Sequence, residues 1–137
     1  MEDSFTEVIE RILDKDSRFA PEAYVFISNA VQYTSSKLME QEEGRRHISG
    51  QELLDGIRDY AIGEFGPMAK TVFESWGVRN TLSIGYIVFN MVDFKLLNSS
   101  ANDSINDFRN GYSFTEAFET PFLPAENAND TPLPVIA

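Results

Sequence analysis

The chain has one basic cluster, Arg45-Arg46-His47, which also contains its single histidine. Arginine side chains bind phosphates and carboxylates through paired hydrogen bonds, so the cluster could hold a phosphate or an acidic partner. Three glutamates lie just before it, at positions 40, 42 and 43, and would balance its charge. We favour a solvated connector here, and we keep Arg45, Arg46 and His47 as candidate binding residues.

The side chains that catalysis and metal binding require are scarce. The chain has no cysteine, which excludes thiol nucleophiles, zinc fingers and iron–sulfur clusters, and its one histidine cannot form a histidine triad. A general base needs a positioned partner, and the sequence orients none for His47. The oxygen-rich stretch Asn98–Asp107 lacks the glycine and the spaced acids of a calcium loop. The sequence predicts no catalytic residue, no metal ligand and no cofactor.

Trp76 and Arg79 are two further candidates for binding. Trp76 is the only tryptophan, and tryptophan is enriched among the residues that dominate protein interfaces. Packing beneath the apolar helix predicted at 81–95 is the alternative that we favour for Trp76. Arg79 and the basic cluster together would support binding of RNA or a ribonucleoprotein, provided that these four residues converge on one face.

The charge balance bears on the kind of partner. The chain has 11 Lys and Arg against 22 Asp and Glu, so its net charge is −11. A field of that sign repels nucleic acid and anionic membranes at long range.

No segment has the roughly 18 apolar residues of a membrane span. The acidic start Met1-Glu2-Asp3-Ser4 does not resemble a signal peptide. Since the chain cannot form disulfides, we expect a cytoplasmic protein.

Three helices are predicted before residue 66. A capping box begins the first at Ser4-Phe5-Thr6-Glu7, and apolar residues then recur at helical spacing to residue 15. Pro21 suits the first turn of a second helix, which runs to about Glu42. A second capping box, Ser49-Gly50-Gln51-Glu52, starts a third helix over 50–65.

The region from residue 50 to 107 follows the order of a winged helix-turn-helix domain. The helix at 50–65 is followed by a short helix at Met68–Trp76 and an amphipathic helix at Thr81–Lys95. Leu96-Leu97 and the polar stretch Asn98–Asp107 then predict a short β-hairpin, with the polar stretch as its wing. These elements together would form a winged-helix-like core.

The charges argue against DNA as the ligand of this core. Its recognition helix would be Thr81–Lys95, whose net charge is zero, and the wing has two aspartates and no basic residue. Each phosphate contact normally requires a cation. Because one fold can host many functions, a winged-helix shape can also dock proteins, which suits an acidic surface better.

The last part of the chain divides into a helical turn and a tail. Ser113-Phe114-Thr115-Glu116 forms a third capping box, so Phe114–Phe118 is predicted to be helical. Four prolines follow from Pro121 onward. We therefore expect a single domain over 1–118 and a flexible or extended tail over 119–137.

Several segments carry a family resemblance: Tyr24-Val25-Phe26-Ile27 with Tyr33-Thr34, Arg46–Leu54, Phe65–Gly77, Ile87–Val92 and Phe114–Phe118. Together they resemble a bacterial family, about 130 to 150 residues long, that is a conserved domain of unknown function. The chain departs from the family at Asp93-Phe94-Lys95, where the family usually has Glu-Ala-Gly, so the glycine that would end the helix is missing. The resemblance implies one compact bacterial cytoplasmic domain and transfers no catalytic or binding residue.

The sequence as a whole predicts a mainly helical domain with two N-terminal helices and a winged-helix-like core. Its favoured function is a non-enzymatic protein-interaction module that binds an unidentified protein through helix 81–95, the hairpin or the basic connector. A nucleic-acid- or ribonucleoprotein-associated factor is the first alternative, and a small-molecule enzyme is the second. If the apolar face of helix 81–95 is wider than the core needs, a homodimer could form there.

Overall fold

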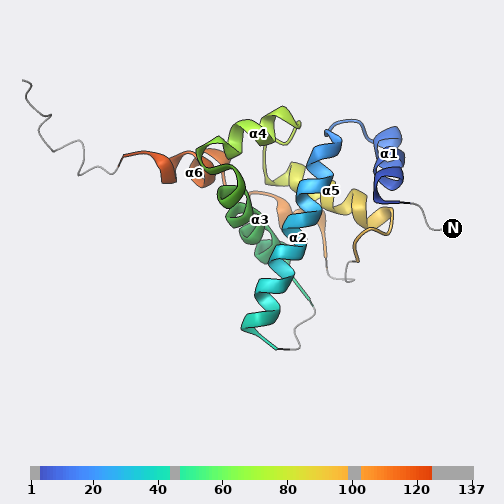
Figure 1. The fold of residues 1–137 in the computed structure, drawn as a ribbon, viewed down its shortest axis with the longest axis horizontal. Coiled ribbons are helices and arrows are strands. Elements are labelled where there is room, and N and C mark those ends of the chain that lie inside the picture. The colour runs from blue at the N-terminus through green and yellow to red at the C-terminus, as the bar shows by residue number, and fades with distance from the viewer. Residues whose placement is uncertain (1–3, 44–46, 99–102, 125–137) are drawn as a thin grey trace, which may run out of the picture.

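The computed structural model describes residues 4–43, 47–98 and 103–124, which form a mainly helical fold (Figure 1). This described part contains no strand, and none of its helices combines the length and the hydrophobicity that a membrane span requires. Its elements are α1 (Phe5–Lys15), α2 (Pro21–Gln41), α3 (Gly50–Phe65), α4 (Ala69–Ser75), α5 (Thr81–Asp93) and α6 (Phe114–Phe118), with the 3-10 helices η1 (Gly66–Met68), η2 (Ile105–Phe108) and η3 (Thr120–Phe122).

Serine caps start three of the helices, as the sequence predicts. The Ser4 hydroxyl accepts a hydrogen bond from the Glu7 amide (3.2 Å), and the Ser113 hydroxyl caps α6 in the same way. At the start of α3, Ser49 and Glu52 form a full capping box, in which each side chain accepts a hydrogen bond from the other residue's amide. These bonds satisfy amides that have no partner inside the helix, so the predicted helix starts are confirmed.

The predicted β-hairpin is wrong for the described residues. Residues 105–108 form η2, which begins with a capping box of Ser104 and Asp107. The Ser104 hydroxyl accepts from the Asn106 amide (3.2 Å), and the Asp107 carboxylate accepts from the Ser104 amide (3.0 Å). These bonds favour a helical start over a strand. Residues 99–102 of the predicted wing, and residues 125–137 of the predicted tail, lie outside the described residues.

α5 ends at Asp93 instead of at Lys95, the predicted end. Lys95 has a φ of +63°, in the left-handed region that a glycine usually occupies after a helix. Its amide donates to the Val92 carbonyl (3.0 Å), and the Leu96 amide donates to the Met91 carbonyl (2.8 Å). This pair of bonds is a Schellman motif, so the helix stops without the glycine of the resembling family, and Leu96 belongs to this turn.

α5 is the central helix of the fold and not a recognition helix. Asp93 is the only exposed residue of α5, all of which the structure describes. α2 and η2 both pack against α5, and its Gly85 lies so close to Phe108 that a Cβ there would stand 2.6 Å from the Phe108 Cβ. A helix that is apolar on nearly all sides is buried in this way. The described residues therefore support the mainly helical class but not the winged-helix-like core.

α2 and α3 pack closely at one point, which sets the spacing of the side chains on their outer surface. At that point Gly56 of α3 faces the buried Thr34 of α2, and a Cβ on Gly56 would collide with the Thr34 side chain. The Thr34 hydroxyl donates to the Ala30 carbonyl (2.8 Å), so it remains satisfied inside the contact. Only a glycine allows this approach of the two helices.

A polar network joins the α1–α2 linker to α5. The Asn90 side-chain amide donates to the Asp16 carboxylate (2.9 Å) and to the Tyr24 hydroxyl (3.0 Å). Arg18 donates to the same carboxylate from Nε and Nη2. The hydrogen bond from Arg18 holds the pKa of Asp16 well below its ordinary value, and burial raises the pKa of Tyr24. The network ties the N-terminal helices to the centre of the fold.

Candidate functional site

Five aromatic side chains form a connected cluster that reaches the surface, which we call the aromatic patch: Phe26, Tyr33, Tyr60, Phe65 and Trp76. The buried Phe26 ring lies at its centre, with ring centroids 5.3 Å from Tyr60, 5.2 Å from Phe65 and 5.6 Å from Trp76. Tyr33 extends the patch through Tyr60, at 5.3 Å. Aromatic pairs at these separations attract each other beyond the effect of area burial.

Three helices hold the patch, and they come from different parts of the chain. Phe26 and Tyr33 lie two turns apart on α2, Tyr60 and Phe65 lie on the last turns of α3, and Trp76 directly follows α4. Figure 1 shows α2 beside α3, with α4 above the point where the two helices diverge. Tyr33 of the patch and Val25, which is next to Phe26 in the sequence, are exposed, with 37% and 46% of their surface accessible.

The tyrosines of the patch differ from Tyr24 and Tyr112, whose hydroxyls are bonded inside the fold. The Tyr24 hydroxyl accepts from Asn90, and the Tyr112 hydroxyl donates to the Leu54 carbonyl (2.9 Å). Within the described part of the chain, the hydroxyls of Tyr33 and Tyr60 have no hydrogen-bond partner. A tyrosine with an apolar ring in contact and a hydroxyl left to solvent is common at protein interfaces.

Charged residues of α2 and α3 border the patch at both of its ends. Glu22 lies one turn before Phe26, and Glu64 lies one turn after Tyr60; both are exposed, and neither forms an ion pair with another described residue. At the other end, Lys37 lies over the Tyr33 ring (5.9 Å to the centroid) and pairs with Asp59 (3.5 Å). The unpaired charge beside the patch is therefore negative.

Trp76 connects the patch to an open depression of about 420 Å³. Its backbone carbonyl accepts from the Ala20 amide (3.0 Å), which docks the end of α4 on the α1–α2 linker. Gly77, with a φ of +83°, lies against the Arg18 carbonyl, where a Cβ would collide. The depression is lined by Leu13, Ser17, Arg18, Phe19, Ala20, Pro21, Ser75, Trp76 and Gly77.

Gly63 leaves a bare position on α3 beside the patch. It lies three residues after Tyr60, so the two residues share a side of the helix. It is exposed, and a Cβ built on it would meet no atom within 4 Å. The surface next to Tyr60 is therefore open.

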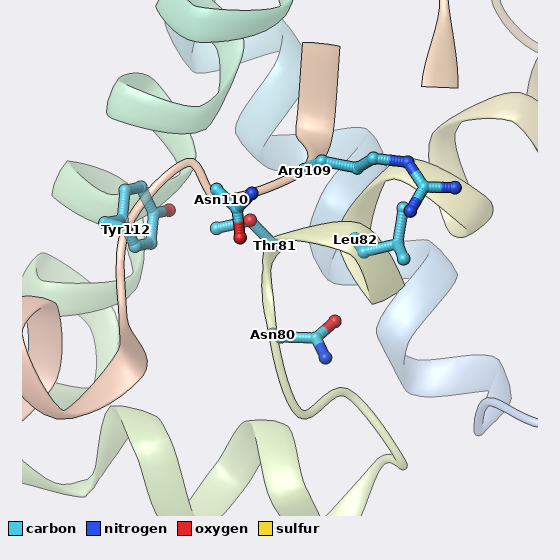
Figure 2. Close-up of a pocket in the computed structure, with 6 residues that line it drawn as sticks. All are labelled: Asn80, Thr81, Leu82, Arg109, Asn110 and Tyr112. Atoms are coloured by element: carbon cyan, nitrogen blue, oxygen red, sulfur yellow. The ribbon is translucent and has the colours of Figure 1, made fainter. Parts of the chain in front are cut away.

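A second hollow, of about 220 Å³, lies at the first turn of α5 (Figure 2). Arg109 and Asn110 reach it from the segment after η2, and Asn80, Thr81, Leu82 and Tyr112 complete its lining. Arg109 Nε donates to Asn106 (2.9 Å), and the Asn80 side chain accepts from the Ser83 amide (2.8 Å) as the helix cap.

The hydroxyls of this hollow serve the fold. Thr81 donates to the Phe108 carbonyl (2.6 Å) and accepts from the Gly111 amide (3.1 Å). Burial raises the pKa of Tyr112, and its hydroxyl donates a hydrogen bond to the Leu54 carbonyl. The lining includes neither a carboxylate nor a histidine that could act as a base. We therefore assign this hollow a structural role.

His47 and Arg79, the two described residues of the predicted basic binding site, lie apart in the structure. His47 pairs with Asp103 (3.7 Å), and the adjacent Ile48 lies with Val88 and Val92 around a small apolar pit at the second half of α5. Arg79 directly precedes Asn80, the cap at the opposite end of α5. Arg45 and Arg46 lie outside the described residues.

Of the predicted site residues, the structure places Trp76 in the aromatic patch. Trp76 is half-buried and packs on Phe26, Phe65 and Phe73 rather than beneath α5. The sequence does not predict Phe26, Tyr33, Tyr60 or Phe65 as site residues. One signal was present, because Phe26 and Tyr33 are seven residues apart and so share a helix face.

The described residues offer neither a metal site nor an unsatisfied buried polar side chain. No group of three His, Asp or Glu side chains in this part of the chain could bind a metal ion. Every buried side-chain nitrogen and oxygen described has a hydrogen-bond partner.

Comparison with known proteins does not assign the chain to a family. No family model, curated protein or solved structure matches the chain. The resemblance to a bacterial domain family therefore stays a prediction.

Proposed function

We propose that this protein is a non-enzymatic protein-interaction module and that the aromatic patch is its binding surface. The observation that carries the proposal is the continuous run of rings from Trp76 to Tyr33, which ends in exposed apolar side chains. Tyrosine and tryptophan are the residues most enriched at the centre of interfaces. The partner is a polypeptide segment whose apolar side chains cover Val25, Tyr33 and Tyr60.

The patch has the mixture of rigidity and exposure that binding requires. Its rings rest on the buried Phe26, and Phe26 also contacts the fully buried Phe73 of the core. A partner would therefore meet side chains that are already ordered, which reduces the entropy lost on association. The tyrosine hydroxyls at its edge can form hydrogen bonds to a partner without breaking any within the described residues.

Site-specific photo-crosslinking in the native cells tests the proposal. A photoreactive phenylalanine analogue replaces Tyr33 in one form of the protein and Met39 in a control form. Met39 is also an exposed apolar residue of α2, but it lies near the C-terminal end of the helix, beyond the patch. We expect a discrete crosslinked protein from position 33 and none from position 39.

The captured protein must then bind directly, and the patch must determine its affinity. We expect the double variant Val25→Ser/Tyr33→Ala to lower the affinity of the purified pair at least about tenfold, as for the loss of an interface hot spot. The control variant Met39→Ser should leave that affinity unchanged. Equal crosslinking from positions 33 and 39, or equal affinity of both variants, would contradict the proposal.

A further inference from the structure

We infer that the partner segment is a positively charged amphipathic helix, an inference that rests on the proposed function. Its apolar face would cover the aromatic patch, and its Lys or Arg side chains would approach Glu22 and Glu64. Two sets of observations lead to this occupant: the length of the apolar surface along α2, and the sign of the charge around it.

The apolar surface has the length of a short helical recognition element. Val25 and Tyr33, both exposed, are eight residues apart on α2, which at about 1.5 Å per residue is about 12 Å along the helix axis. Two turns of a partner helix, with apolar residues at i, i+4 and i+7, span a similar length. The rings of Tyr60 and Trp76 widen the surface to the side, so that α2 forms one edge of a broad contact.

The charge around the patch selects a cationic partner. Glu22 and Glu64 border it with no ion pair to another described residue, whereas Lys37, the cation at its far end, already pairs with Asp59. Aromatic faces attract Lys and Arg, and they do so more strongly where a partner excludes water. The net charge of −11 adds a long-range attraction for a basic segment and repels an acidic one.

Two designed peptides test this inference on the full chain. Each has about 18 residues and the same leucines at helical spacing. One has lysines on its polar face and the other has glutamates, and neither has an aromatic residue. Trp76, the only tryptophan of the chain, reports binding through its fluorescence. At about 0.15 M salt, where exposed charges beyond about 8 Å are screened, we expect the lysine peptide to bind at least about tenfold more tightly.

Matched variants separate local charge from total charge. Glu22→Gln/Glu64→Gln removes the two carboxylates at the patch, and Glu10→Gln/Glu116→Gln removes two exposed carboxylates elsewhere. Both variants lose the same net charge. We expect the patch pair to weaken binding of the lysine peptide about two- to tenfold, as for two surface ion pairs, and the control pair to leave it nearly unchanged.

Three results would overturn the inference. They are equal binding of the two peptides, equal loss in the two charge variants, and a dimer of the free protein that Tyr33→Ala dissociates in sedimentation. The third result would assign the patch to a second copy of the chain. If any of these occurred while Val25→Ser/Tyr33→Ala still weakened the captured partner, the inference would fail and the proposed function would stand.

Discussion

α2 and α5 pack against each other, yet they differ in how they use their apolar residues. α5 has one exposed residue, Asp93, and its other side chains pack into the fold. α2 buries one face and turns Val25, Tyr33 and Met39 outward. α5, whose apolar residues have the more regular helical spacing, buries them in the fold. α2 has a less regular spacing and leaves part of its apolar surface exposed. That exposed part is where we place the binding surface.

The largest expected effect comes from α5. Ile87 is fully buried, so Ile87→Ala should lower the free energy of unfolding by about 2–5 kcal/mol, through lost transfer energy and the cavity that remains. Denaturation in urea, followed by Trp76 fluorescence, measures this change. A loss below about 1 kcal/mol would mean that α5 does not occupy the centre of the fold.

The contact between α2 and α3 should give the next largest effect. Gly56→Ala places a Cβ against Thr34, and overpacking of this kind costs about 1–3 kcal/mol. Because the contact also sets the separation of Tyr33 from Tyr60, we expect partner affinity to fall as well. Thr34→Ala should restore part of the stability in the double variant, and strictly additive effects of the two substitutions would contradict this contact.

The network around Asp16 should make stability depend on pH. Its pKa is lowered in the folded chain, chiefly by Arg18, so its contribution is present above its ordinary pKa of 3.8 and is lost as the pH falls. At pH 7, Asp16→Asn should cost about 1 kcal/mol of unfolding free energy. Denaturation at several pH values should show a smaller loss between pH 5 and 2 for this variant than for the unsubstituted chain.

The smallest stability effect should come from the patch itself. Tyr33 is exposed, so Tyr33→Ala should change the free energy of unfolding by no more than about 0.5–1 kcal/mol, although it should weaken partner binding strongly. Denaturation and partner titration on the same sample measure both quantities. A stability loss as large as that of Ile87→Ala would mean that Tyr33 belongs to the core. α2 and α5 would then not differ in how they use their apolar residues.

The local part of the fold could be predicted from the sequence, because local chemistry sets it. Ser4, Ser49 and Ser113 start helices as their capping boxes predict. The same rule applied to Ser104 and Asp107 predicts the start of η2, whereas the polar composition of the stretch favours the wing of a hairpin. The error came from the order of the helices, which matches more than one tertiary arrangement.

The candidate site could not be predicted in the same way. The rings of Phe26, Phe65 and Trp76 meet only because three helices pack together, and no local pattern links them. The burial of α5 likewise depends on α2 and η2 covering it. Residue type alone makes Trp76 a candidate, and its place in the patch depends on Gly77 and on the docking of α4 on the α1–α2 linker.

The bare position at Gly63 makes the patch open to direct spectroscopy. The chain has no cysteine, so Gly63→Cys would give a single attachment point for a spin label or fluorophore one turn from Tyr60. Since a side chain there meets no neighbour and glycine is a poor helix former, the substitution should not destabilise α3. A label at this site, with Trp76 as the energy donor, would report in real time whether the surface is occupied.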